Sequence, residues 1–230
     1  MEKKIIAIIP ARGNSKRLKN KNMLKLNGKP LIYHTIKAAI KSKLIDEIFV
    51  STECIKIKTY AESLDIKVID RPKSLSKDKS QNNDVVLHSI NYLEKMSKII
   101  DIILLLQVTS PFRNEKHIDE SLELFFKHRK YNSCLSGCEV KYHPAKMIEL
   151  SNNQIIPYTN DVEFDARTQD LKKIYQQNGA IYIVKRDAFI KNKTFFSRPC
   201  LLYKMDQKCS IDIDDEFDLG FANFFIRNKL

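Results

Sequence analysis

Strand-like and helix-like patterns alternate through the first half of this chain, and this alternation constrains the fold more than any other feature. Short apolar runs rich in β-branched residues suit buried strands, and longer segments with apolar residues at helical spacing suit covering helices. The expected strands span residues 5–9, 47–51, 67–69 and 101–106, and the expected helices span 31–40, 54–64, 84–96 and 114–127. Such alternation builds strand–helix–strand units. We therefore predict an α/β, Rossmann-like fold with a mainly parallel, mixed sheet and helices on both faces.

The alternation breaks after about residue 133. Residues 139–177 contain two prolines and many polar residues without a clear period, which predicts an irregular insertion that acts as a lid or as an oligomer-forming arm. Strand patterns return at 180–184 and 201–205, and residues 216–227 predict a closing amphipathic helix. Its apolar residues are Phe217, Leu219, Phe221, Phe224 and Phe225. No boundary divides the chain, so we expect a single domain over residues 1–230.

The charge of the chain points to an anionic partner. Forty Lys and Arg residues outnumber 28 Asp and Glu residues, which gives a net charge of +12. Such a field attracts nucleic acid, an acidic membrane or a charged small substrate. The lysines are spread along the chain, however, and form no stripe typical of nucleic-acid binding. No apolar run is long enough for a signal peptide or a membrane span, so we expect a cytoplasmic protein without a membrane partner.

The loop after the first expected strand concentrates positive charge. Residues 10–22 hold two arginines, three lysines and the hydroxyl of Ser15, and Gly13 would let the backbone approach an anion closely. Concentrated charge with fixed donors is what a polyphosphate needs. Neither the Walker pattern nor the dinucleotide-binding pattern is present. The loop is therefore interpreted as a polyphosphate site of another kind, and the alternative is a solvated basic turn.

An acidic segment near the end of the chain offers a metal site. Asp212 and Asp214 lie two residues apart, so in an extended segment their carboxylates fall on one face. Mg²⁺ accepts one or two carboxylates and takes its other ligands from phosphates and water. The alternative is an acidic turn that caps the final helix through Asp214 or Asp215.

Two polar segments follow expected strands. Residues 107–113 offer an amide, two hydroxyls and a guanidinium at the carboxyl end of a buried strand, where ligands of parallel sheets bind. Arg71 follows another strand, and Ser80 and Asn82 lie in the next loop, where they could contact the edge of a base. The alternative for both segments is an ordinary polar connection.

Seven short segments, in order along nearly the whole chain, match the motifs of one family. Residues 9–22 read Ile-Pro-Ala-Arg-x-x-Ser-Lys-x-x-x-x-Lys-Asn. The other segments are Gly-Lys-Pro-Leu at 28–31, Arg-Pro-x-x-Leu at 71–75, Leu-Gln-x-Thr-Ser-Pro-x-Arg at 106–113, His-Pro-x-Lys at 143–146, Asn-Gly-Ala-Ile-Tyr at 178–182 and Ile-Asp-Ile-Asp-x-x-x-Asp-Leu at 211–219. In these motifs the chain resembles the N-acylneuraminate cytidylyltransferases, the enzymes that make CMP-sialic acid.

This resemblance implies a role for each matching residue. The nucleotide CTP would be held by Ala11, Arg12, Gly13, Ser15, Lys21 and Asn22, and its cytosine by Arg71, Ser80 and Asn82. The sugar acid would be contacted by Gln107, Thr109, Ser110, Lys146, Arg167, Gln176 and Asn178. The catalytic residues would be Arg12, Lys21 and Asp214, and Mg²⁺ would be bound by Asp212 and Asp214. Residues 139–177 would form the arm of a homodimer and reach over the partner's site.

The implied reaction is attack of the anomeric hydroxyl of a nine-carbon 2-keto sugar acid on the α-phosphate of CTP, with loss of pyrophosphate. A metal-bound water or Asp214 would accept the hydroxyl proton. Catalysis would rest on positioning and on neutralising charge.

Two departures from the family pattern fall where the sugar should bind. Gln176 and Gln177 replace the usual Arg-Pro, and Thr168 stands where an arginine is usual, with Arg167 one place earlier. Asn82 stands where a serine is common, and Val108 replaces a proline. Loss of a guanidinium that pairs with a carboxylate is not conservative. Arg167, Lys172 or Lys173 could compensate.

These departures leave the acceptor open. Legionaminate or another bacterial nonulosonate is an alternative to N-acetylneuraminate, whereas the intact Asn178–Tyr182 segment disfavours pseudaminate. That segment and the Lys21-Asn22 pair also disfavour 3-deoxy-manno-octulosonate. A basic nucleic-acid-binding protein is the alternative from another class, and no recognisable module supports it.

Overall fold

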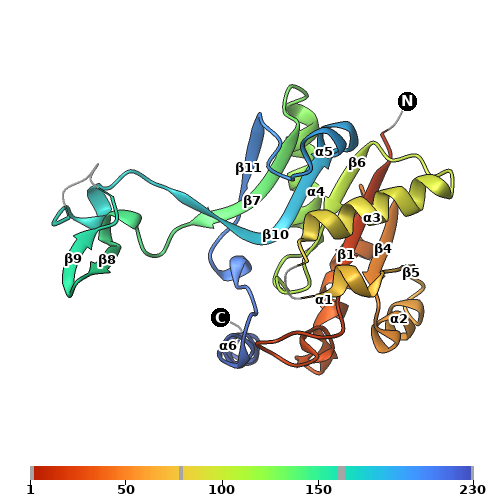
Figure 1. Ribbon diagram of the computed structural model, residues 1–230, viewed down its shortest axis with the longest axis horizontal. Coiled ribbons are helices and arrows are strands. Elements are labelled where there is room, and N and C mark those ends of the chain that lie inside the picture. Colours follow the sequence, from red (N-terminus) through yellow and green to blue (C-terminus); the bar gives the residue numbers. More distant parts are fainter. Residues whose placement is uncertain (1–2, 78–79, 160–163, 229–230) are drawn as a thin grey trace.

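A seven-stranded sheet forms the centre of the computed structural model, which describes residues 3–77, 80–159 and 164–228 (Figure 1). Its strands, in spatial order, are β11 (Cys200–Lys204), β7 (Ser133–Glu139), β10 (Tyr175–Lys185), β6 (Ile102–Leu105), β1 (Ile5–Pro10), β4 (Glu47–Thr52) and β5 (Lys67–Asp70). Neighbouring strands run parallel, except that β10 is antiparallel to both β6 and β7. The predicted mixed, mainly parallel α/β sheet is confirmed.

Helices cover both faces of the sheet because its strands are apolar on both sides. Along β1, Ile5, Ala7 and Ile9 belong to one apolar cluster, whereas Ile6 and Ile8 belong to another. This is the alternation of side chains expected along a strand. The first cluster is covered by α1 (Leu31–Lys41), α2 (Ile55–Glu62) and α4 (Glu115–Lys127), and the second by α3 (Asn82–Lys95) and α5 (Arg186–Asn192). The expected helices therefore form, with ends shifted by at most two residues.

Capping side chains fix where two helices begin. Asn114 accepts a hydrogen bond of 3.2 Å from the backbone N–H of His117 and thereby starts α4, as the sequence predicted. Asp215 accepts one of 3.0 Å from the N–H of Asp218 and starts α6 (Glu216–Arg227). Asp215, not Asp214, is therefore the cap.

The expected apolar face of α6 is only partly buried. Leu219 packs against the first cluster and Phe225 against Phe112, with ring centroids 5.3 Å apart. The other three aromatic residues, Phe217, Phe221 and Phe224, are exposed. The helix thus packs by one narrow edge instead of the broad stripe that the sequence predicted.

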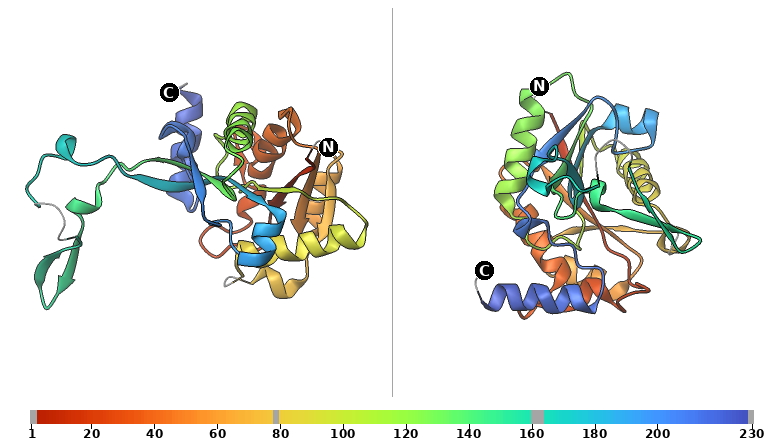
Figure 2. Two further views of the ribbon diagram at one scale, coloured as in Figure 1. Left: turned by 90° about the horizontal axis from the view of Figure 1, so that it is seen from above. Right: turned by 90° about the vertical axis from the view of Figure 1, so that its left-hand side faces the viewer.

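Residues 139–177 leave the body of the molecule as an arm, which Figures 1 and 2 show extending far from the sheet. The prediction that this segment is irregular is wrong in two places. The arm carries an antiparallel hairpin of β8 (Ile148–Ser151) and β9 (Gln154–Pro157). Strand β10 also begins at Tyr175, five residues earlier than expected, and pairs there with Glu139 of β7. Both bases of the arm are therefore continuous with the central sheet.

Short elements complete the connections. They are β2 (Lys25–Leu26), β3 (Lys29–Pro30) and the 3₁₀ helices η1 (Lys21–Met23), η2 (Lys73–Ser76), η3 (Pro144–Lys146), η4 (Thr168–Asp170) and η5 (Lys208–Ser210). Within the described ranges, no helix is both long enough and apolar enough to cross a membrane.

Candidate active site

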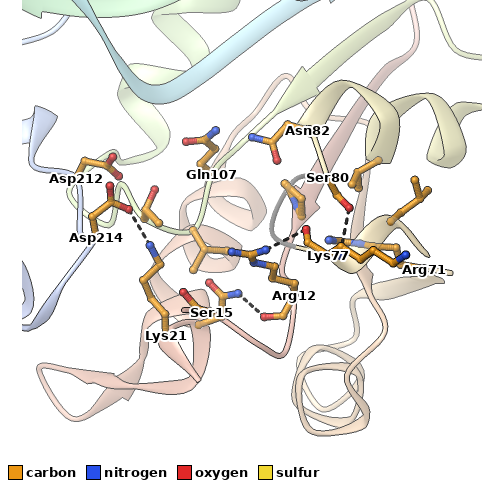
Figure 3. Close-up of a pocket in the computed structure, with 16 residues that line it drawn as sticks. Arg12, Ser15, Lys21, Arg71, Lys77, Ser80, Asn82, Gln107, Asp212 and Asp214 are labelled. Carbon is orange, nitrogen blue, oxygen red and sulfur yellow. Dashed lines mark hydrogen bonds and ion pairs between the residues drawn. The ribbon is translucent and has the colours of Figure 1, made fainter. Parts of the chain in front are cut away.

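A cavity of about 270 Å³ lies at the carboxyl ends of β1, β5 and β6 (Figure 3). This is the edge at which parallel sheets bind ligands. Its lining gathers many residues singled out from the sequence, namely Arg12, Ser15, Lys21, Asn22, Arg71, Ser80, Asn82, Gln107, Thr109, Asp212 and Asp214. The remaining lining residues are Pro10, Leu75, Lys77, Val85 and Val108. Four segments far apart in sequence thus meet at one place.

The loop after β1 presents its polar side chains to this cavity. Arg12, Ser15 and Lys21 all line it. The amide of Asn22, which is nearly buried, donates a hydrogen bond of 2.8 Å to the carbonyl of Arg12 and holds the loop in a curve. The loop therefore concentrates two cations and a hydroxyl at the cavity, as the basic sequence predicted.

Two residues of this loop that were predicted to contact the nucleotide do not line the cavity. Ala11 is fully buried, and its N–H donates to the carbonyl of Ser51 at 3.0 Å. Gly13 lies against the start of α2, where an added Cβ would come within 2.8 Å of the Cβ of Cys54. The glycine therefore permits close packing of the loop on the protein itself, which is a different reason from the approach to an anion that the sequence suggested.

Asp214 is held by two cations. The Nζ of Lys21 donates to Asp214 Oδ1 at 2.9 Å (Figure 3). It also donates to the carbonyl of Ile213 at 3.0 Å, and Arg17 donates to Asp214 Oδ2 at 2.9 Å. Burial alone would raise the pKa of Asp214, but the hydrogen bond and charge of Lys21, together with the charge of Arg17, outweigh it and lower this pKa. Asp214 is therefore ionised at neutral pH.

Asp212 lies deeper and has a different environment. Burial raises the pKa of its carboxyl, and the charge of Asp214 adds to this, while a hydrogen bond from Thr109 opposes it. Among the described residues, no Lys, Arg or His forms an ion pair with Asp212. The charge of Lys21 also lowers this pKa but only partly offsets the burial, so the desolvated carboxylate has an environment in which a bound cation is favourable.

The two carboxylates are ligands of the kind that suits Mg²⁺. No group of three or more His, Cys, Asp or Glu side chains that could hold a metal occurs in the described part of the chain. Mg²⁺ needs only one or two carboxylates when phosphates and water complete its six ligands. Asp212 and Asp214 line the same cavity as Arg12 and Lys21, where phosphates would lie.

Arg71 contributes a buried guanidinium to the far wall of the cavity. Its Nε donates to Ser51 Oγ at 3.3 Å, and its guanidinium also donates to the carbonyl of Ser51. Burial lowers the pKa of Arg71 to about 10, which leaves it charged at neutral pH. The side chain is thus fixed by the end of β4 before any ligand arrives.

Lys77 is a lining residue that sequence reasoning missed. Its carbonyl accepts a hydrogen bond of 3.1 Å from Arg12, and its N–H donates to Ser80 Oγ at 3.1 Å. It lies between two motif segments and belongs to neither, so only its charge could have drawn attention to it. The contact with Arg12 joins the loop after β1 to the wall that carries Ser80.

A second cavity, of about 240 Å³, adjoins the first and shares Asn82 and Gln107 with it. Its other lining residues are Gln81, Asn83, Leu105, Leu135, Gln177, Tyr182, Thr194, Phe195 and Phe196. These residues combine amides and hydroxyls with three aromatic rings, and none of them carries a charge at neutral pH. Among them the sequence had singled out Asn82 and Gln107 as site residues and Gln177 as a departure from the family pattern.

Gly179 sets the position of Gln107 between the two cavities. It adopts a φ of +74°, and an added Cβ would lie 2.9 Å from Oε1 of Gln107. Glycine is therefore needed here both for the left-handed backbone and for the space that the Gln107 amide occupies.

Two predicted sugar contacts are buried instead. Ser110 is fully buried, and Asn178 is nearly so. The Oδ1 of Asn178 accepts hydrogen bonds from Ser136 at 2.6 Å and from the N–H of Ala180 at 3.2 Å, and its Nδ2 donates to Ser210 at 2.8 Å. Asn178 thus ties β7 and β10 to the segment that leads to Asp212, and it lines neither cavity.

Two neighbouring glutamines, Gln176 and Gln177, differ in their position relative to the two cavities. Gln176, the predicted sugar contact, lines neither cavity, and its Nε2 lies 3.8 Å from the Sγ of Cys138. Gln177 lines the second cavity. Of the two glutamines, only Gln177 lines a cavity of the site.

Lys146, in η3, and Arg167, which directly precedes η4, belong to the arm and line neither cavity of their own chain. The Nζ of Lys146 donates to the carbonyl of Phe164 and lies 5.7 Å from the centroid of its ring. Lys172 and Lys173 also line neither cavity, and Lys173 pairs with Glu139 at 3.6 Å. All four cations thus lie outside the lining of the two cavities of their own chain.

Comparisons with known proteins place these observations in a family. A family model described as cytidylyltransferase matches residues 6–222. The chain is 36% identical to the N-acylneuraminate cytidylyltransferase of Streptococcus agalactiae serotype V over 98% of its own length and 55% of that relative. It is also 36% identical to the CMP-N,N′-diacetyllegionaminic acid synthase of Legionella pneumophila, over 94% of its own length and 93% of that relative. The chain thus spans about half the length of the first relative.

The fold has a counterpart among solved structures. A CMP:2-keto-3-deoxy-manno-octonic acid synthetase complexed with CTP superimposes with a TM-score of 0.75 over 99% of this chain and 100% of that one. The two sequences are 16% identical, so the likeness concerns the fold alone.

Proposed function

Because this chain belongs to the cytidylyltransferase family, we propose that it transfers CMP from CTP to a nine-carbon 2-keto sugar acid and releases pyrophosphate. One observation carries the proposal. A single cavity brings Arg12 and Lys21, which suit phosphates, to the carboxylates of Asp212 and Asp214 and opens beside a second, uncharged cavity. The test is release of pyrophosphate from CTP in the presence of Mg²⁺ and a panel of sugar acids.

The proposed reaction uses both cavities. The anomeric oxygen of the sugar attacks the α-phosphorus, the bond to the β-phosphate oxygen breaks, and pyrophosphate leaves. The hydroxyl proton passes to solvent, directly or through a carboxylate of the Asp212 and Asp214 pair. Arg12 and Lys21 neutralise charge on the transferring and leaving groups, and Gln107, at the junction of the cavities, orients the sugar. Mg²⁺, bound by Asp212 and Asp214, would supply further positive charge at the phosphates.

The nucleotide contacts are proposals of the same kind. Arg71 and the Ser80–Asn82 loop lie at the end of the cavity opposite the two carboxylates (Figure 3). If the triphosphate lies near Lys21 and Asp214, this wall faces the cytosine. The fixed guanidinium of Arg71 then offers donors to its carbonyl oxygen.

The acceptor is proposed to be a nonulosonate with acylamino groups. The second cavity offers amide groups and the rings of Tyr182, Phe195 and Phe196, which suit neutral polar and methyl groups. Relatives named for N-acylneuraminate and for N,N′-diacetyllegionaminate are equally similar to this chain, at 36% identity. Legionaminate and N-acetylneuraminate are therefore the first two acceptors to compare.

Substitution of Gln177 should change the choice of acceptor. We expect Gln177→Ala to alter the ratio of kcat/KM values for legionaminate and N-acetylneuraminate by about tenfold, because loss of one hydrogen bond to the bound sugar is worth about 1.4 kcal/mol. The KM for CTP should stay within about twofold of wild type, since Gln177 does not line the first cavity. Steady-state kinetics with both sugars measure these values.

Gln176→Ala is the matched control for this substitution, because Gln176 lines neither cavity. It should leave the ratio of the two kcat/KM values within about twofold of wild type. A larger change for Gln176→Ala than for Gln177→Ala would contradict the assignment.

The arm is proposed to form a homodimer. Its hairpin exposes Ile148, Leu150, Ile155 and Ile156, and Tyr158 beside it is exposed as well. Ile148, Leu150 and Ile155 share one face of the hairpin, and exposed apolar side chains gathered in this way are typical of an interaction surface. The second cavity lacks a cation for the carboxylate of the sugar, and the arm of a second copy could bring Lys146 and Arg167 to it. On this proposal residues 1–230 form one nucleotidyltransferase domain, with residues 139–177 inserted as the arm.

Leu150→Glu should therefore yield a monomer. We expect light scattering to show a dimer for the wild type and a monomer for this variant, because the charge would be buried at the interface. The KM for the sugar should rise at least about tenfold while CTP still binds. Ile99→Glu, at an equally exposed position outside the arm, is the control and should stay dimeric. A monomeric wild type at full activity would contradict the proposal.

A further inference from the structure

The carboxylate of Glu53 joins the two loops that enclose the first cavity. Its Oε1 accepts a hydrogen bond of 2.7 Å from the backbone N–H of Gly13, in the loop after β1. Its Oε2 accepts one of 2.8 Å from Ser76 Oγ, at the end of η2. No sequence motif includes Glu53, and it does not line the cavity. One side chain thus links the loop that carries Arg12 to the wall that carries Lys77 and Ser80.

The topology explains why a residue at this place can join them. Strand β4 lies between β1 and β5, and Glu53 directly follows its last residue, Thr52. One step earlier, the carbonyl of Ser51 accepts hydrogen bonds from the N–H of Ala11 and from the guanidinium of Arg71. Beyond these contacts the sheet ends, and the loops no longer have a ladder of backbone hydrogen bonds to hold them. Glu53 provides the next link outward from β4.

The contact with Gly13 also decides which groups of the loop face the cavity. The N–H of Gly13 points to Glu53, and the loop packs so closely on α2 that no Cβ fits at this position. The side chains of Arg12 and Ser15, on either side, line the cavity instead. The hydrogen bond between Arg12 and the carbonyl of Lys77 spans the same two loops from the cavity side.

From this arrangement we infer that Glu53 is a positioning residue, whose carboxylate holds the two loops at the spacing that the nucleotide needs. The inference rests on the proposed function, because it takes CTP as the ligand. Glu53 acts through Gly13 and Ser76 and touches neither substrate nor metal.

A purely electrostatic role makes the opposite prediction. A carboxylate near the phosphates repels them, so removing its charge would tighten the binding of CTP. The charge of Glu53 also favours the ionised form of Arg71 and raises its pKa, against the larger lowering by burial. The effects of side-chain length and of charge at position 53 must therefore be tested with separate variants. Gln has the same length, and it can accept the N–H of Gly13 and donate to Ser76 without a charge.

The experiment measures the affinity of the full chain for CTP with Mg²⁺ by calorimetry. We expect Glu53→Ala, which loses both hydrogen bonds, to weaken CTP binding about tenfold. Ser76→Ala loses one of them and should weaken binding about threefold, and Glu53→Gln keeps both and should weaken it less than about threefold. Glu53→Ala with Ser76→Ala should be no weaker than Glu53→Ala alone, since Ser76 acts through Glu53. The control is Glu62→Ala, at an exposed glutamate of α2. The value of kcat at saturating CTP should stay within about twofold of wild type in every variant.

Hydrogen exchange in the absence of nucleotide gives a second measurement. In Glu53→Ala the amides of residues 12–14 and 74–77 should exchange faster together, while those of α4 stay unchanged. Unchanged exchange in both loops, unchanged affinity for CTP, tighter binding in Glu53→Gln, or additive effects of the two alanines would each overturn the inference. A wild-type chain that binds no CTP contradicts the proposed function, and the exchange data then still decide whether Glu53 couples the loops.

Discussion

Asp212→Asn is expected to lower turnover at least about 10³-fold, or about 4 kcal/mol in the barrier, while the protein still folds. Asp212 is the buried carboxylate of the first cavity, and no cation of the described protein pairs with it. The amide of asparagine has the shape of the carboxylate but lacks the negative charge that would hold Mg²⁺ beside the phosphates. The variant should also need far more Mg²⁺ for its residual activity.

The same substitution should not destabilise the protein in the absence of Mg²⁺ and CTP. Burial raises the pKa of Asp212 in the folded state, so at neutral pH the ionised carboxyl opposes folding. The neutral amide removes this cost, and the thermal midpoint at pH 7 should equal or exceed that of wild type. The difference in thermal midpoint between the variant and the wild type should disappear at acidic pH, where the carboxyl of Asp212 is protonated in both the folded and the unfolded chain.

Asp215→Asn is the matched control for Asp212→Asn. Asp215 caps α6 and does not line the cavity, and asparagine is an equally good cap. Both variants should fold, but only Asp212→Asn should lose turnover. Activity of Asp212→Asn within about tenfold of wild type at saturating Mg²⁺ would exclude the metal role.

Lys21→Met is expected to lower kcat/KM for CTP about 10²- to 10³-fold, because the ammonium is the most buried cation close to the two carboxylates. Methionine keeps the apolar stem and removes the charge. Asp214 then loses the more buried of its two partners, so its pKa should rise and the two carboxylates would face the phosphates with less positive charge to offset them. We expect both a higher KM for CTP and a lower kcat.

Lys19→Met tests whether this effect comes from the position or only from the total charge. Lys19 lies in the same loop, is exposed and does not line the cavity. The Lys19→Met variant should keep its kcat/KM for CTP within about threefold of wild type, because exposed charges are strongly screened. Equal losses in the two variants would indicate a general electrostatic effect in place of the specific contact of Lys21 with Asp214.

The sequence predicted the sheet well where side-chain patterns were strong. The strands β1 and β6 are apolar on both faces, and Asn114 marks the start of α4. It missed β7 because the segment Ser133–Glu139 holds small and polar residues without β-branched neighbours, although six of its seven residues are buried. Burial there comes from the helices that cover the sheet and from β10 and β11 beside it. Such tertiary effects are not encoded in the local pattern.

The site shows a similar limit. The motifs predicted most of the lining of the first cavity, because strand ends meet at one edge of a parallel sheet. Adjacent residues of a strand face opposite sides, so a shift of one residue decides between Gln176 and Gln177. The pairing of β10 with β7 is irregular between Gln177 and Tyr182, and no sequence pattern fixes that register. Glu53 contacts the backbone of Gly13 and the side chain of Ser76, and Lys77 contacts Arg12 through its carbonyl, and no motif marks either residue.

The most direct measurement is pyrophosphate release by the wild-type chain with CTP, Mg²⁺ and, in separate reactions, legionaminate, N-acetylneuraminate, pseudaminate and 3-deoxy-manno-octulosonate. We expect pyrophosphate release with a nine-carbon sugar acid and a product with the mass of the corresponding CMP-sugar. We expect almost no pyrophosphate release with Asp212→Asn. Release with 3-deoxy-manno-octulosonate alone would contradict the proposed acceptor class. No release with any of the four sugars, in protein that binds CTP, would contradict the proposed transfer itself.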